Sequence, residues 1–302
     1  MKAIITSLFF TILIFILVNE SKKVQQQDYI YYSSEGYSNG AKGRDIIRMS
    51  PDGSLKNKLT SNNGKNHYPH HINAKLSPNG KKIVYQSDID RHDSYTIWVM
   101  NEDGSNKQKI TKEEGMYPNW SADGNQIVFS GRRNGVWEII IIPSVGGKEK
   151  IISKNLEKGN KPGWGATCTF NPNGKTLVYS YVREKILYLL DLNTEKISQL
   201  TNSKDKYTHP IFSKDGSNIA VNRKTTNSNS YDLILIKPDG TETKVISKNI
   251  ISYSPPAWSD LGNELLFSGM VDGNQQLFKI DLDTKKETML TSKPFFNAMP
   301  TW

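Results

Sequence analysis

The stretch Met116–Ser130, MYPNWSADGNQIVFS, returns in imperfect copies along most of the chain. Read with the side-chain period of two that β-strands have, Tyr117–Ser121 predicts one short strand and Gln126–Ser130 predicts a second. Between them, Ala122–Asn125 contains the Asp-Gly pair typical of a tight turn with positive φ. The stretch therefore predicts a β-hairpin.

The same turn recurs at similar distances. Turn glycines at positions 80, 124, 174, 216 and 262 are 44, 50, 42 and 46 residues apart. Each hairpin is followed by a third apolar run, and most have a fourth short segment that ends in an apolar residue plus Thr or Ser. These endings are Leu59-Thr60, Ile110-Thr111, Ile152-Ser153, Leu200-Thr201, Ile246-Ser247 and Leu290-Thr291. Six such endings predict an all-β fold, a six-bladed β-propeller with four-stranded antiparallel blades.

The two ends of the chain predict how the ring closes. Met299–Trp302 repeats the innermost strand and then stops without its hairpin partner. Near the other end, Tyr29–Ser33, Asp45–Ser50 and Leu55–Thr60 supply three further strands. We expect the last blade to be closed by N- and C-terminal strands, because this pairs sheet edges that are otherwise open.

Two recurring motifs resemble the WD40-like β-propeller repeat of the TolB family. The first, P-x-W-S-x-D-G-x-x-I-x-F-S, is best seen at Pro118–Ser130, and the second, I-W-x-M-x-x-D-G-S, at Ile97–Ser105 before Ile110-Thr111. The resemblance covers nearly everything after residue 27 and implies a TolB-like six-bladed propeller that engages a peptide or protein at its funnel mouth. An N-terminal α/β domain of the kind found in TolB is not expected here.

The N-terminus has the pattern of an export signal. Met1-Lys2 precedes the apolar run Ala3–Val18, which is short for a membrane span. We expect residues 1–24 to be a signal peptide, with an uncleaved anchor as the alternative, and residues 25–302 to be the propeller. The mature chain is then extracytoplasmic, either periplasmic or secreted, and has no membrane span.

Composition narrows the classes of partner. The formal charge is +9 with a pI near 9.3, and many lysines lie in or beside turns, where they protect strand edges. Attraction to acidic glycans or to an anionic envelope surface is the functional interpretation. Nucleic acid is excluded, because no basic stripe interleaved with aromatic residues is present. Cys168 is the only cysteine and lies in an innermost strand, so we expect a packed side chain rather than a nucleophile.

Loops divide between the two faces of such a propeller. The face with the hairpin turns holds short Asn-Gly and Asp-Gly sequences that offer little chemistry. The opposite face has longer loops, which hold all five histidines and six of the seven arginines, so function is expected there. The candidate residues around the funnel are His70, His71, Tyr117, Thr167, His209, Tyr253 and Asn297.

Three arginines follow second strands and are candidates for one shared ligand. They are Arg132, Arg183 and Arg223. A guanidinium group suits a carboxylate or sulfate, because its parallel N–H donors match two oxygens.

An enzymatic alternative also uses this face. The chain is somewhat similar to propeller lyases for uronate polymers, in which funnel histidines bind a metal. That resemblance implies a divalent metal held by candidates among His70, His71, His92 and His209, with an arginine neutralising the substrate carboxylate.

The sequence lacks several enzyme signatures, including the Gly-x-Ser-x-Gly elbow, the P-loop and paired-cysteine zinc motifs. We therefore expect a monomeric binding or interaction module without a cofactor. Its partner is an envelope protein, a peptide or an acidic glycan. A signalling module is the third alternative.

Overall fold

The hairpin turns show why the repeated Ser, Asp and Gly residues are needed. In the computed structural model, the Gln126 N–H donates to the Ser121 hydroxyl (2.9 Å) and the Asn125 N–H donates to the Asp123 carboxylate (3.0 Å). The turn glycines have φ between 69° and 74°, where a side chain costs about 1 kcal/mol or more. They are Gly80, Gly124, Gly174, Gly216 and Gly262.

The structure describes residues 29–38, 41–61, 67–153, 165–181, 185–201, 205–228, 230–292 and 296–302. The expected export signal, residues 1–24, lies outside these ranges. Within them the chain forms antiparallel sheets, and no helix there has the length and apolar character that a membrane crossing needs.

Three four-stranded sheets follow one another along the chain, each in the order of its strands. The first contains β4 (His71–Leu76), β5 (Lys82–Ser87), β6 (Thr96–Asn101) and β7 (Gln108–Lys109). The second contains β8 (Gly115–Trp120), β9 (Gln126–Arg133), β10 (Val136–Pro143) and β11 (Lys150–Ile151). The third contains β12 (Ala166–Phe170), β13 (Thr176–Tyr181), β14 (Leu187–Asp191) and β15 (Ile197–Gln199).

An eight-stranded sheet follows, with two four-stranded halves joined only by the pair Ile250↔Gly269. One half contains β16 (Lys206–Phe212), β17 (Ile219–Lys224), β18 (Tyr231–Ile236) and β19 (Glu242–Ile250). The other half contains β20 (Ala257–Trp258), β21 (Glu264–Val271), β22 (Asn274–Asp281) and β23 (Glu287–Met289).

The remaining sheet combines both ends of the described chain. Its order is β24-β1-β2-β3. The bounds are Asn297–Thr301 for β24, Ile30–Ser38 for β1, Ala41–Met49 for β2 and Lys56–Lys58 for β3. Tyr31 pairs with Thr301 and Ser33 pairs with Ala298, as the repeat in the sequence predicts.

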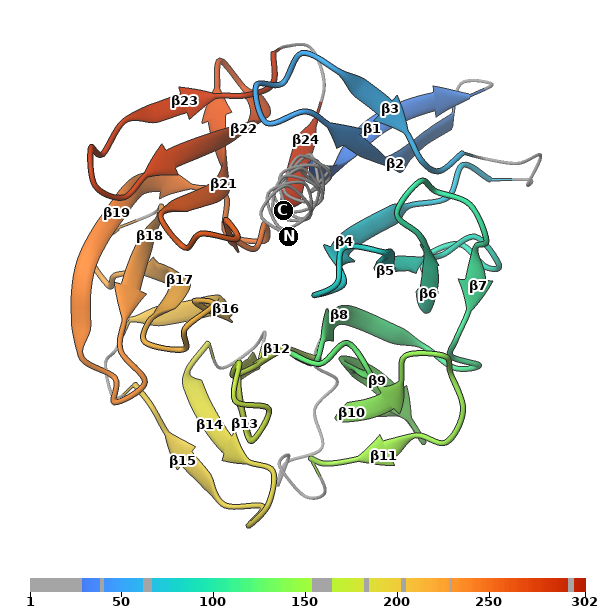
Figure 1. Cartoon of the computed structure of the whole chain (residues 1–302), viewed down its shortest axis with the longest axis horizontal. Coiled ribbons are helices and arrows are strands. Elements are labelled where there is room, and N and C mark those ends of the chain that lie inside the picture. Colours follow the sequence, from blue (N-terminus) through green and yellow to red (C-terminus); the bar gives the residue numbers. More distant parts are fainter. Residues whose placement is uncertain are drawn as a thin grey trace, which may run out of the picture.

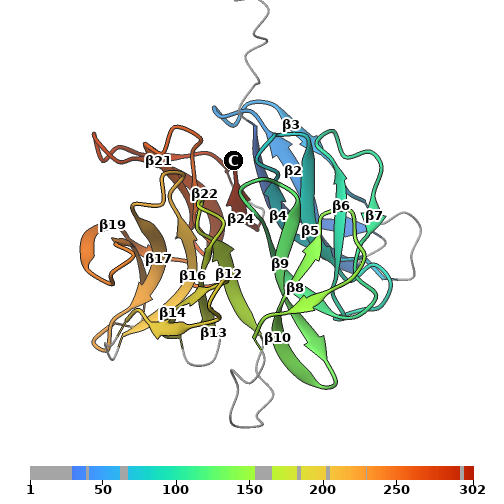
Figure 2. The same cartoon turned by 60° about the horizontal axis from the view of Figure 1, so that its bottom comes forward.

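The sheets are arranged radially, as Figure 1 shows, with β4, β8, β12, β16 and β24 nearest the centre. In the tilted view of Figure 2, β24 lies between β22 and β4, and it contacts both strands. Hydrophobic core fills the spaces between neighbouring sheets. For example, Val128 and Ile139 of one sheet pack with Leu177 and Tyr179 of the next. Complete burial of each such side chain stabilises the fold by roughly 1.5 to 3 kcal/mol.

The Thr or Ser that ends five of the six repeats also has a structural role. Its hydroxyl accepts a hydrogen bond from a third-strand N–H 14 residues earlier, as in Ile46 to Thr60 (2.9 Å) and Ile97 to Thr111 (2.9 Å). The same bond joins Ile139 to Ser153, Leu187 to Thr201 and Leu277 to Thr291. The ending thus holds the outermost segment against its sheet.

The apolar residue before this hydroxyl contacts the next sheet. A Cβ built on Gly104 lies 3.1 Å from the Leu59 carbonyl oxygen, and one on Gly240 lies 2.3 Å from the Leu200 carbonyl oxygen. A Cβ built on Gly53 lies 2.5 Å from the Leu290 carbonyl oxygen in the same way. At these three junctions, neighbouring sheets therefore fit together through a glycine turn that leaves little space for a side chain, whereas a Cβ on Gly146 lies at an ordinary 3.5 Å from the Ile110 carbonyl oxygen.

We predict that Gly240→Ala destabilises the protein more than Gly135→Ala does. Both glycines have positive φ, but a Cβ at Gly135 meets no atom within 4 Å. The contact with Leu200 is expected to add on the order of 1 to 3 kcal/mol to the loss of unfolding free energy. Urea denaturation of both variants measures the difference, and equal losses would contradict the close contact between sheets.

Candidate functional site

The innermost strands contain a repeated irregularity that sets which side chains face the centre. Asn73, Tyr117, His209 and Met299 have φ between 56° and 59°, which is uncommon for residues other than glycine. Strand pairing shifts register at all four of these positions. Such a bulge turns the following residues to the other side of the strand.

The last residues of the innermost strands form a ring around a pocket of about 290 Å³, here called the mouth pocket. The ring consists of Leu76, Trp120, Phe170, Phe212, Trp258 and Trp302. The Trp120 indole N–H donates to the Lys75 carbonyl (2.8 Å) and the Trp258 indole N–H to the Ile211 carbonyl (3.2 Å). These bonds tie neighbouring strands together and fix two of the rings.

Below this ring, Lys75 lines the mouth pocket and is only 7% exposed. Its ammonium nitrogen has no hydrogen-bond partner within the described ranges. Burial lowers the pKa of Lys75 to about 8, and no neighbouring carboxylate opposes this effect. A buried cation without a partner destabilises a fold, so its presence here favours a role in binding.

A second, smaller cavity of about 20 Å³, the inner cavity, continues from the mouth pocket. Lys75, Asn119, Thr169 and Ile211 line both spaces. The further lining residues include Asn73, Tyr117, Thr167 and His209. About one water molecule fits in such a space.

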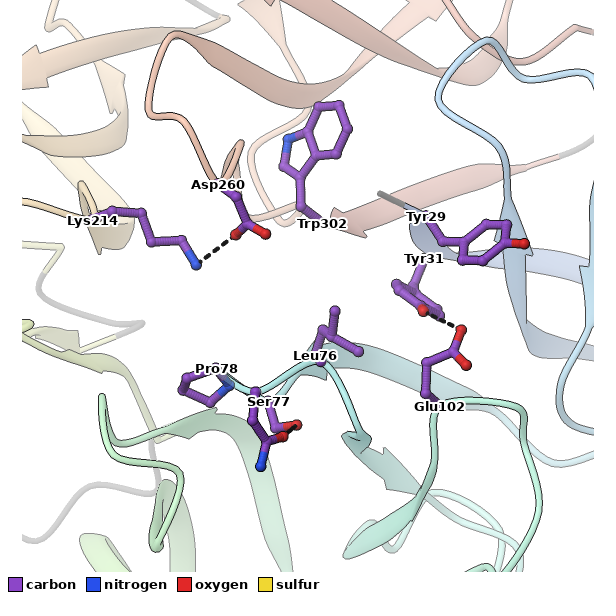
Figure 3. Close-up of a pocket in the computed structure, with 11 residues that line it drawn as sticks. Tyr29, Tyr31, Leu76, Ser77, Pro78, Glu102, Lys214, Asp260 and Trp302 are labelled. Carbon is purple, nitrogen blue, oxygen red and sulfur yellow. Dashed lines mark hydrogen bonds and ion pairs between the residues drawn. The ribbon is translucent and has the colours of Figure 1, made fainter. Parts of the chain in front are cut away.

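A third space of about 450 Å³, the side pocket, shares Leu76, Pro78, Lys214 and Trp302 with the mouth pocket. Figure 3 shows Lys214 paired with Asp260 (3.0 Å) on one side, and Tyr31 bonded to Glu102 (2.8 Å) on another. Trp302 lies between Asp260 and Tyr29 in this view. The two pockets therefore meet at the same opening.

Comparisons with known proteins agree with this architecture. A profile described as the TolB β-propeller domain matches residues 152–302, which is half of the chain. The chain belongs to the TolB β-propeller family. A TolB homologue of Chlorobaculum tepidum is 33% identical over 108 residues, which make up 35% of this chain and 24% of the relative.

Solved structures show the same fold. TolB from Acinetobacter baumannii superposes with a TM-score of 0.78 at 19% identity, over 91% of this chain and 66% of that one. A putative TolB from Agrobacterium tumefaciens gives a TM-score of 0.63 at 18% identity, over 89% and 91% of the two chains. This TolB-family chain thus spans less than two thirds of the Chlorobaculum and Acinetobacter relatives.

In this TolB-family propeller, the predicted funnel residues divide into separate groups. Tyr117, Thr167 and His209 do come together, in the inner cavity, where the Tyr117 and His209 rings lie edge to face at 6.0 Å. Burial lowers the pKa of His209 to about 3, so this ring is neutral at pH 7.

The other histidines lie near the start of β4. His70 and His67 pack against the exposed His92 ring at 6.4 and 5.5 Å, and the His70 amide donates to Asp88 (2.6 Å). Burial lowers the pKa of His70, and it lowers that of His71, packed on Tyr85, to about 4. Within the described ranges, no three His, Cys, Asp or Glu side chains are grouped closely enough to hold a metal ion.

The remaining candidates have partners of their own. Tyr253 stacks on Phe296 at 6.4 Å, and the buried Asn297 accepts a hydrogen bond from Ser34 (3.0 Å). Arg132 lies 3.7 Å from Glu114, whereas Arg223 contacts Glu242 and Asp232. Arg183 lies outside the described residues. Arg132 lines a surface pocket beside Glu114, and Arg223 is not among the residues of that pocket.

Cys168 is packed as expected, because it is 1% exposed and burial raises the pKa of its thiol to about 12. The mouth pocket was not predicted from the sequence. Its signal was the aromatic residue that precedes Ser or Asn at the end of an innermost strand, as in Trp120-Ser121, Phe170-Asn171, Phe212-Ser213 and Trp258-Ser259.

We predict that Lys75→Met raises the unfolding free energy at pH 7 by on the order of 1 to 3 kcal/mol, because it removes an unpaired buried charge. Folded Lys75 loses its proton near pH 8, whereas the unfolded residue loses it near 10.5. The cost is therefore complete below pH 8 and disappears as pH rises to 10.5.

Urea denaturation at several pH values measures the difference in unfolding free energy between Lys75→Met and the unchanged protein. Lys286→Met, at an exposed residue, is the control, and its unfolding free energy is expected to stay close to that of the unchanged protein at every pH. A Lys75→Met protein that is less stable than the original at pH 7 would contradict an unpaired ammonium.

Proposed function

We propose that this chain is a binding module that holds a segment of a partner protein or a peptide in the mouth pocket. The observation that carries the proposal is the ring of apolar and aromatic side chains above a buried, unpartnered lysine. Aromatic side chains dominate the energetics of protein interfaces, and a few polar groups below them give specificity. Membership of the TolB family agrees with a role in protein interaction.

We also propose that the sheets are six blades in a closed ring. Dividing the eight-stranded sheet at its single joining pair leaves six four-stranded units. The approach of Gly53 to Leu290 repeats the contact between other neighbouring units, and it joins the first unit to the last. This observation supports closure by N- and C-terminal strands.

An extracytoplasmic location, periplasmic or secreted, is part of the proposal. Its support is the apolar run Ala3–Val18 after Met1-Lys2, which is typical of an export signal. A monomeric propeller would then meet its partner in the cell envelope or outside the cell.

A random peptide library displayed on phage tests the binding proposal. The selected consensus peptide is expected to bind Lys214→Glu roughly tenfold more weakly than the unchanged protein, because a rim cation becomes an anion. Lys214 is exposed and lines both pockets, so the change should leave the fold intact. Affinities are measured by calorimetry.

Lys286→Glu is the matched control, because it makes the same charge change at an exposed residue outside these pockets. It should leave peptide affinity unchanged. If no consensus emerges, or if both variants bind equally well, the mouth pocket is not the binding site.

A disulfide tests closure of the ring. Ser33 and Ala298 are directly paired across β1 and β24 and are both fully buried. Their joint replacement by Cys is expected to form an intrachain disulfide and to stabilise the protein by up to about 5 kcal/mol, because it closes a very long loop. Non-reducing electrophoresis and thermal melting measure the result. A pair that stays reduced under oxidising conditions would count against closure.

A further inference from the structure

The Lys75 ammonium is a charged hydrogen-bond donor at the base of the mouth pocket. Its ammonium is buried and has no hydrogen-bond partner within the described ranges. The described residues that line the mouth pocket and the inner cavity include no aspartate or glutamate. The nearby ionisable ring of His209 is neutral at pH 7. Nothing described in these two spaces therefore balances the Lys75 charge.

Trp302 provides a second donor at the same pocket. Its indole nitrogen is buried and, within the described part of the chain, has no acceptor. The equivalent indoles of Trp120 and Trp258 donate to carbonyl oxygens of neighbouring strands at 2.8 and 3.2 Å. Trp302 therefore departs from the repeat, and its N–H is available to a ligand.

Two donors, one of them cationic, favour an anion with two acceptor oxygens. A carboxylate has this arrangement and forms short, charge-assisted bonds with ammonium groups. Phosphate and sulfate have more acceptor oxygens, so two donors would leave some of these oxygens without a hydrogen bond. The ring of apolar and aromatic side chains suits the hydrocarbon part of an amino acid that carries the carboxylate.

We propose that the mouth pocket recognises a carboxylate of a peptide, with Lys75 and Trp302 as its two donors. This inference rests on the proposed peptide-binding function and specifies the chemical group that is bound. The carboxylate belongs to an acidic side chain or to the C-terminus of the partner. Lys214 at the rim adds positive charge, although its nitrogen pairs with Asp260 at 3.0 Å.

Small probes distinguish the sources of the carboxylate. N-acetylglutamate amide carries only a side-chain carboxylate, and N-acetylphenylalanine carries only a terminal one. N-acetylglutamine amide has neither group and should not bind. Binding is followed by the indole N–H signals in NMR titrations, with Trp302→Phe to assign the Trp302 signal. At least one carboxylate probe is expected to shift this signal.

Two variants test the donors. Lys75→Met is expected to weaken binding of the carboxylate probe at least tenfold, and Trp302→Phe, which retains a ring but has no N–H, should weaken it about threefold to tenfold. Lys286→Met should bind the probe as the unchanged protein does. The inference would be overturned if neither carboxylate probe bound more tightly than N-acetylglutamine amide, or if Lys75→Met bound the carboxylate probe normally.

Other outcomes separate this inference from the proposed function. A library-selected peptide that needs Lys214 but has no carboxylate, and binds Lys75→Met normally, would overturn the inference and leave the peptide-binding function intact. If galacturonate bound through Lys75 while both amino-acid carboxylates did not, the ligand would be an acidic sugar, and the peptide assignment would be wrong.

Discussion

In five copies of the repeat, a hydrogen bond from a third-strand amide to the hydroxyl that ends the repeat holds the outermost segment against its sheet. Donor and acceptor are 14 residues apart in each of these copies. This bond places the preceding Leu or Ile carbonyl where the glycine turn of the next sheet fits against it, as Leu59 does for Gly104. Neighbouring sheets then bury their apolar faces together. The radial arrangement thus depends on short polar contacts as well as on the core.

These contacts explain why so much of the fold could be predicted from the sequence. Each one requires a particular residue type: a hydroxyl at Thr111, a serine at Ser121, a glycine at Gly124. Such requirements survive in imperfect copies and mark the repeat. The pairing of β24 with β1 followed from the same repeat, because an unpaired innermost strand needs a partner.

The site was harder to predict, because its orientation depends on backbone geometry that no residue type marks clearly. Lys75 lies in a strand where simple alternation assigns faces, but the bulge at Asn73 shifts the register between Ile72 and Lys75. The site was predicted at the histidine-containing loops because an imidazole can bind a metal or transfer a proton. The structure instead places Lys75 at the base of the circle of apolar and aromatic side chains around the mouth pocket. This is the face with the short hairpin turns, where no functional residue was predicted. Among the described candidates, Tyr117, Thr167 and His209 line one cavity together.

The narrowness of the inner cavity has a consequence for anything that enters the propeller. Beyond Lys75 the space contracts from about 290 to about 20 Å³, between residues such as Tyr117 and His209. A guest larger than a water molecule does not fit into the inner cavity beyond Lys75. An extended chain would therefore have to end there or fold back. A bound chain would then leave through the mouth pocket by which it entered.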